Sequence, residues 1–271
     1  MKKSVRLRLI QSITVMALLA TVALANAGTA LTANQALSTL LSGNTPYLAG
    51  NFAALSKNAQ PGVRTTLAAG QSPYAIVLGC SDSRVSPEII FDKGLGEVFP
   101  VRVAGNIIAD HEIGSIEYGV EHLCAPLIVV LGHTKCGAVT AAAQYAFPLL
   151  SGSSARPIPL STAPANGSIN SLINTLLPAV TLAYDNSIPG SITTYQQLVD
   201  PAIIQNVKTT AADLRAKSAI VEEAIVTGMP AACLTTATPT PGKLLPGTKA
   251  RLVGAEYDVT TGAVTLIPLA P

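Results

Sequence analysis

Residues 74–84 read YAIVLGCSDSR, a short apolar run that turns abruptly into polar residues. An unbroken apolar run of this length is typical of a strand buried on both faces of a sheet. Two later stretches, Glu97 to Val103 and Leu127 to Gly132, have the same character. Between them, Ile113 to Leu123 carries apolar residues at helical spacing. The order strand, helix, strand predicts a parallel sheet.

Helical segments are expected before and after these strands in the sequence. Thr32 to Lys57 carries apolar residues at helix-like spacings, interrupted around Gly43 to Pro46, and predicts an N-terminal helical arm. Two longer helices are expected at Ile169 to Asn186 and at Val199 to Thr227. The fold class is therefore α/β, with a central, mainly parallel sheet flanked by helices.

A pair of strands, at Ala250 to Tyr257 and Ala263 to Ile267, is expected to close the chain. Two segments rich in Pro, Ser, Thr and Gly, near 148–166 and 230–246, are interpreted as insertions. Neither is interpreted as a domain linker, because sheet-like elements occur on both sides. Residues 28–271 are expected to form one domain.

Residues 1–27 have the pattern of a secretory signal peptide. An apolar stretch from about Ile10 to Leu24 is followed by small residues, which predicts cleavage after Ala25 or Ala27. An uncleaved membrane anchor is the alternative, but the stretch is shorter than the ~20 residues that a span needs. The mature chain is thus expected to be exported, to the periplasm or beyond. The basic residues of the leader are Lys2, Lys3, Arg6 and Arg8.

The composition is 49% hydrophobic and 12% charged, with no Trp. Without the four basic residues of the leader, the remaining chain has 13 basic and 15 acidic residues, a net charge of −2. That balance excludes a basic patch for nucleic acid. No second run of about 18 uncharged apolar residues follows the leader, so no membrane association is expected after its removal.

Residues able to bind a transition metal follow two of the predicted strands. Cys80 comes directly after the first, and His133 and Cys136 come after the third. Ligands of parallel sheets collect at the carboxyl ends of the strands, so these side chains are expected to meet. Two thiolates and an imidazole suit one Zn²⁺ per chain and leave a fourth position open, as catalysis requires.

Other interpretations of these residues remain. A lone His-x-x-Cys pattern is weak, since either residue can belong to an ordinary core. A disulfide between Cys80 and Cys136 is compatible with export, yet it leaves His133, Asp82 and Arg84 without a shared purpose.

The motifs Cys80 to Arg84 and His133 to Gly137 resemble the two zinc motifs of β-class carbonic anhydrases. The resemblance extends from about Leu40 to Ile267 and is greatest to the plant-like subgroup. The leader and the two Pro-rich insertions depart from the family. Further segments resemble it, namely Glu88 to Asp92, Arg102 to Asn106, Gly114 to Tyr118 and Val253 to Tyr257.

The resemblance implies a zinc-dependent reversible hydration of carbon dioxide to bicarbonate and a proton. Asp82, kept ionised by a bidentate pair with Arg84, is expected to accept a hydrogen bond from hydroxide on the zinc. Arg84 orients the carboxylate, because a guanidinium does not deprotonate. A subgroup whose bicarbonate site contains a Trp is a poorer match. Water is therefore expected as the fourth ligand near neutral pH, with Asp82 taking that place only in an inactive acid form.

The resemblance also assigns a substrate pocket and an assembly. Gln71 is expected to hydrogen-bond bicarbonate, and Phe99 and Tyr118 to line the carbon dioxide pocket at a subunit boundary. Each can equally be an ordinary loop or core residue. A homodimer or a dimer of dimers is expected.

Alternatives remain for the function and for the remaining reactive residues. An enzyme with the same fold and metal can hydrolyse carbonyl sulfide or carbon disulfide. An exported zinc-binding protein without activity is a third interpretation. His111 and His122 are interpreted as surface or capping residues, and a proton shuttle is the alternative for His111. Cys124 and Cys233 are either a disulfide or simple buried thiols.

Overall fold

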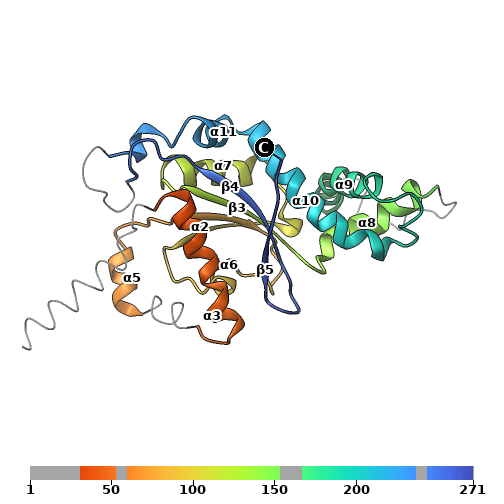
Figure 1. Cartoon of the computed structure of the whole chain (residues 1–271), viewed down its shortest axis with the longest axis horizontal. Helices are drawn as coiled ribbons and strands as arrows, with labels where there is room; N and C mark the ends of the chain where they lie inside the picture. Colours follow the sequence, from red (N-terminus) through yellow and green to blue (C-terminus); the bar gives the residue numbers. More distant parts are fainter. Residues whose placement is uncertain (1–30, 53–59, 153–166, 236–242, 271) are drawn as a thin grey trace, which may run out of the picture.

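A five-stranded sheet with the strand order β2-β1-β3-β4-β5 forms the centre of the molecule (Figure 1). The structure is a computed structural model that describes residues 31–52, 60–152, 167–235 and 243–270. The first four strands of that order are parallel to one another, and the last is antiparallel to its neighbour. The strands are β1 (Ala75–Gly79), β2 (Val98–Arg102), β3 (Leu127–His133), β4 (Arg251–Tyr257) and β5 (Val264–Ile267).

Helices surround the sheet, and an N-terminal helical arm precedes it, which confirms the predicted fold class (Figure 1). The helices described are α2 (Ala33–Ser42), α3 (Asn44–Leu48), α5 (Pro61–Leu67), α6 (Pro87–Ile90), α7 (Asp110–Glu121), α8 (Gly137–Leu150), α9 (Ser168–Asp185), α10 (Tyr195–Lys217) and α11 (Ala219–Val226). Two short 3₁₀ turns are η1 (Ala104–Asn106) and η2 (Ala231–Cys233).

Side chains alternate between the two faces of the sheet and build two cores. Ile76 and Leu78 of β1 belong to a core formed with α7, α10 and α11. Ala75 and Val77 belong to the opposite core, formed with α2 and α6. Every residue of β1 and β3 is buried, as the unbroken apolar runs in the sequence predicted.

A third core lies beyond the sheet, where α8 and α9 pack on the first part of α10 (Figure 1). Small residues such as Ala142, Ala143 and Ala202 allow these helices a close approach. The same core includes Cys80 and Cys136. This layer therefore covers the end of the sheet from which the predicted metal ligands come.

The prediction of one helix over Val199 to Thr227 is wrong. The chain forms α10 and α11 instead, separated at Ser218, whose backbone is extended (φ −115°, ψ 105°). Its hydroxyl accepts a hydrogen bond from the Val221 N–H at 3.1 Å and donates one to the Glu117 carboxylate at 2.7 Å. This buried serine caps α11 and thereby ends the helix before it.

The helical arm breaks at Gly43, where a Cβ would lie 1.7 Å from the carbonyl oxygen of Phe91. Pro46 lies in the first turn of α3, so the interruption is narrower than predicted. Pro148, assigned to an insertion, lies in the last turn of α8.

Some predictions concern residues that lie outside the described ranges. These are the leader over 1–27, the arm beyond residue 52, and the parts of the two insertions at 153–166 and 236–242. Among the helices that the structure describes, none is long and apolar enough to cross a bilayer.

Candidate metal centre

β1 and β3 are parallel neighbours, so the residues at their carboxyl ends meet at one edge of the sheet. Cys80 follows the last residue of β1, His133 is the last residue of β3, and Cys136 is the N-cap of α8. The potential ligand atoms of these three residues all lie within 4.8 Å of one another, and all three side chains are buried. The structure thus brings together the three residues predicted as ligands.

His133 is oriented by the backbone next to it. Its Nδ1 lies 3.0 Å from the carbonyl oxygen of Thr134, which fixes Nδ1 as the protonated nitrogen. Nε2 is buried and has no hydrogen-bond partner. A buried polar atom without a partner is rare, and a metal ion at this position would supply one.

Both thiols receive backbone N–H groups. The Cys80 sulfur accepts from the N–H of Gly105 at 3.3 Å and from that of Asp82 at 3.4 Å. The N–H groups of Ala138 and Val139, at the start of α8, point at the Cys136 sulfur. Donors placed in this way stabilise thiolates, which are the form that binds metal.

The two thiols also perturb each other. The hydrogen bond from Cys136 lowers the pKa of Cys80, and the same bond raises the pKa of Cys136. One proton is thus shared between them in the absence of a cation, and a bound cation favours thiolate on both. Cys80 and Cys136 are free cysteines, so the alternative of a disulfide between them is not what the structure has.

Asp82 and Arg84 form a bidentate pair beside the ligands. Arg84 donates from Nε to Oδ1 at 2.9 Å and from Nη2 to Oδ2 at 2.7 Å, and its backbone N–H donates to Oδ1 at 3.0 Å. These hydrogen bonds hold the pKa of the Asp82 carboxyl far below its usual range. Oδ2 lies 4.0 Å from Nε2 of His133. The pairing expected from the sequence is therefore present, next to the metal cluster.

Arg102 holds the loop that carries Cys80 and Asp82. Its guanidinium donates to the carbonyl oxygens of both residues, at 3.0 Å and 2.7 Å. Arg102 is not among the site residues predicted from the sequence. The signal in the sequence is its position at the end of a predicted strand, the kind of position from which Cys80 and His133 also come.

Gln71, Phe99 and Tyr118 lie elsewhere in the same chain. Gln71 is exposed and precedes β1, whereas Cys80 follows the strand. Phe99 pairs in register with Ile76, four residues before Cys80, which is roughly 13 Å along a strand. The rings of Phe99 and Tyr118 are 6.2 Å apart. One chain alone does not bring these three residues to the metal cluster, and their pocket role stays a prediction.

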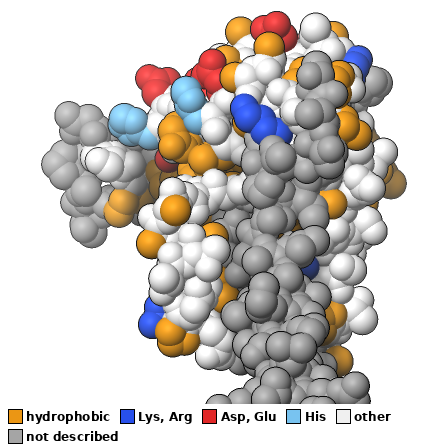
Figure 2. All heavy atoms as spheres, turned by 90° about the vertical axis from the view of Figure 1, so that its left-hand side faces the viewer, with side chains coloured by type: hydrophobic (Ala, Val, Ile, Leu, Met, Phe, Trp, Pro, Cys, Tyr) orange, Lys and Arg blue, Asp and Glu red, His pale blue; other side chains and the backbone are white. Residues whose placement is uncertain are grey.

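His111 and His122 lie in and next to α7 and are not members of the metal cluster. His122 is 3.7 Å from the Glu121 carboxylate, and its ring is 5.1 Å from that of Tyr118. Figure 2 shows histidine and acidic side chains around apolar ones on the face at the left of Figure 1. These contacts fit the interpretation of surface residues.

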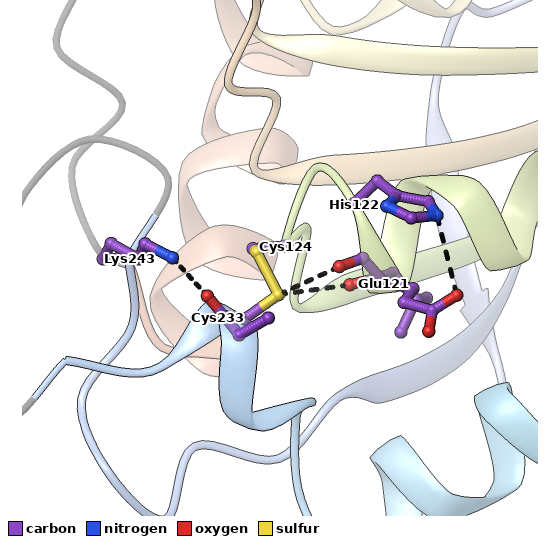
Figure 3. The surroundings of a disulfide bond; sticks show 7 residues. Glu121, His122, Cys124, Cys233 and Lys243 are labelled. Carbon is purple, nitrogen blue, oxygen red and sulfur yellow. Dashed lines mark hydrogen bonds and ion pairs between the residues drawn. A yellow bond between two sulfur atoms is a disulfide. The ribbon is translucent and has the colours of Figure 1, made fainter.

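Cys124 and Cys233 form a disulfide (Figure 3). Cys124 lies between α7 and β3, and Cys233 ends η2, 109 residues later. Lys243 donates to the carbonyl oxygen of Ala232 beside the bond. The question that the sequence left open is thereby answered in favour of a disulfide.

The comparisons with known proteins agree with this site. The family described as carbonic anhydrase matches residues 75–264. Over 79 residues the chain is 62% identical to carbonic anhydrase 2 of Mycobacterium tuberculosis, a match that covers 29% of this chain and 38% of that relative's length. The carbonic anhydrase of Mycolicibacterium smegmatis is 35% identical over 197 residues, which cover 73% of this chain and 84% of that protein.

Among solved structures, the fold is similar to that of tetrameric β-carbonic anhydrases from the filamentous ascomycete Sordaria macrospora. The TM-score is 0.56 at 23% sequence identity, and the match covers 77% of this chain and 87% of that one. At this identity the likeness concerns the fold.

Proposed function

The chain belongs to the β-carbonic anhydrase family, and on that premise we propose that it catalyses the reversible hydration of carbon dioxide to bicarbonate and a proton with one zinc ion. The observation that carries this proposal is the convergence of Cys80, His133 and Cys136 on one buried point. Two sulfurs and one nitrogen suit zinc, and three protein ligands leave a position for water or substrate. The activity is proposed for the whole protein. The matches cover 38% of the length of the Mycobacterium tuberculosis relative and 84% of that of the Mycolicibacterium smegmatis relative.

The donor atoms fit the ion in kind and in state. Nε2 of His133 is buried and without a partner, and the sulfur of each cysteine faces backbone N–H groups. A zinc ion held by these atoms supplies a Lewis acid that lowers the pKa of water. Because two thiolates offset its charge, neighbouring groups must contribute to the activation.

Asp82 is proposed as the neighbour that does so. Arg84 keeps its carboxylate ionised and fixes the direction of both oxygens. Oδ2, 4.0 Å from Nε2 of His133, would accept a hydrogen bond from a water or substrate molecule held beside the ligand cluster. The pairing with Arg84 supports an open site, since it holds the carboxylate away from the ligand set.

Gln71, Phe99 and Tyr118 are proposed to form the substrate pocket, with Gln71 holding the product anion and the two rings facing carbon dioxide. Since they lie far from the metal cluster of their own chain, this role requires a second copy of the chain. We therefore propose a homodimer or a dimer of dimers. The fold neighbours from Sordaria macrospora are tetrameric.

Export is proposed together with this activity. The leader pattern over residues 1–27 predicts it. The disulfide between Cys124 and Cys233 supports it, because such bonds persist in oxidising compartments.

Parallel assays of carbon dioxide hydration and of carbon disulfide and carbonyl sulfide hydrolysis test the substrate. Turnover of carbon dioxide well above that of the sulfur compounds is expected. The reverse order would favour the hydrolase alternative, and no turnover of any of them would favour a zinc-binding protein without activity.

A further inference from the structure

We propose that Asn206, on helix α10, is a positioning residue for the metal centre. Its side-chain amide holds Gly105 so that the Gly105 N–H remains directed at the Cys80 sulfur. The inference rests on the proposed zinc site and deepens it. Nothing in the sequence motifs of the site includes this helix.

Two hydrogen bonds that share one glycine form the connection. Nδ2 of Asn206 donates to the carbonyl oxygen of Gly105 at 2.7 Å, and the N–H of the same glycine donates to the Cys80 sulfur at 3.3 Å. Both bonds are buried. The two groups flank a single Cα and are joined through φ and ψ of Gly105, so a hold on the carbonyl restricts the directions that the N–H can take while the neighbouring chain stays in place.

The backbone conformation of Gly105 depends on contacts from other segments of the chain. Its backbone is left-handed (φ 74°, ψ 15°), a conformation that glycine tolerates and that side chains oppose. A Cβ there would lie 3.1 Å from Leu176 Cδ1 and 3.3 Å from the Cβ of Ala138. A side chain at this position would be strained, and glycine leaves the backbone with the widest conformational freedom.

Burial of the Asn206 amide costs free energy of folding. Asn206 is 3% exposed, on a helix that also buries Ile203 and Val207. An amide buried among aliphatic side chains destabilises the fold unless it is hydrogen-bonded. The bond to Gly105 offsets that cost, and it connects a helix of the third core to the turn that touches a ligand sulfur.

A residue that only anchors α10 to η1 would affect folding and nothing else. A residue that directs an N–H at a metal-bound sulfur also changes the metal, because hydrogen bonds to ligands tune affinity and electron donation. The two roles can therefore be distinguished by measuring the properties of bound metal in a variant that still folds.

The test uses the full chain with Asn206→Leu, which has similar volume and no donor. Zinc affinity is measured by chelator competition, and the protein loaded with Co²⁺ is examined for the charge-transfer band from thiolate to cobalt. We expect zinc affinity to fall about 10- to 100-fold and the band to shift. Thr210→Val, a buried polar-to-apolar change one turn further along α10, is the matched control and should leave both unchanged.

Asn206→Ala, which removes the donor without adding bulk, provides the measurement if the leucine variant does not fold. Folded variants with wild-type zinc affinity and an unshifted band would overturn the inference while leaving the proposed function intact. Failure of the wild-type chain to bind zinc or cobalt would instead overturn the proposed function, and this inference with it.

Discussion

Oδ2 of Asp82 lies 4.0 Å from Nε2 of His133, the nitrogen that has no hydrogen-bond partner. The carboxylate is thus close to the metal position without belonging to the ligand cluster. Each of its two oxygens accepts one hydrogen bond from the Arg84 side chain and has a further lone pair. The separation leaves the carboxylate free to act on a molecule bound at the centre, which is the basis of the first prediction.

Asp82→Asn should lower the turnover of carbon dioxide by about 100-fold or more, because an amide has no negative charge and replaces one acceptor oxygen with an NH₂ donor. Zinc content should stay at the wild-type level, since Asp82 is not one of the clustered ligands. Stopped-flow hydration and elemental analysis of the same sample measure both. Asp213→Asn, which removes an exposed carboxylate paired with Lys217, is the control. Unchanged turnover in the Asp82 variant would refute its role.

Cys136→Ser should release zinc, because a serine hydroxyl is a far poorer ligand than a thiolate. It should also destabilise the fold, since His133 and Cys80 then face each other without a cation. The double variant Cys124→Ser/Cys233→Ser, which removes the other two cysteines, should retain one zinc per chain. Tight stoichiometric zinc in Cys136→Ser would show that the ligand set is misassigned.

The same double variant should unfold more easily. The disulfide closes a loop of 109 residues, and for a loop of that length the chain-entropy model gives about 4 to 5 kcal/mol. Urea unfolding of zinc-loaded protein measures the difference. Treating the wild-type chain with a reductant should reproduce the loss of stability. Equal stability of the two forms would mean that the bond contributes nothing to the fold.

The chain should sediment as a dimer or a larger assembly at micromolar concentration. Tyr118, whose side chain is 48% exposed, is proposed to lie at the boundary between copies, so Tyr118→Glu should weaken the assembly and lower activity together. Ile188→Glu changes an even more exposed apolar residue and should do neither. A wild-type monomer with full activity would contradict the shared pocket.

Much of the fold follows from the sequence because buried parallel strands give continuous apolar runs. The runs around Ile76 and Val129 stand out for this reason, and both are fully buried. The ligands could be predicted because each follows such a run, and the ends of neighbouring parallel strands meet.

Other features depend on contacts that no local pattern records. The helix break at Ser218 comes from a capping hydroxyl and from a partner, Glu117, about a hundred residues away. The disulfide joins two cysteines separated by 109 residues. The bond from Asn206 to Gly105 also spans 101 residues. Each becomes visible only once the sheet has placed these segments beside one another.

The central claim is tested most directly by one sample of the chain without residues 1–27, in which zinc content and stopped-flow hydration of carbon dioxide are measured together. We predict one zinc per chain and rapid hydration, lost when a chelator removes the metal and restored when zinc is returned. One zinc per chain without hydration, or hydration that persists after the metal is removed, would contradict the account.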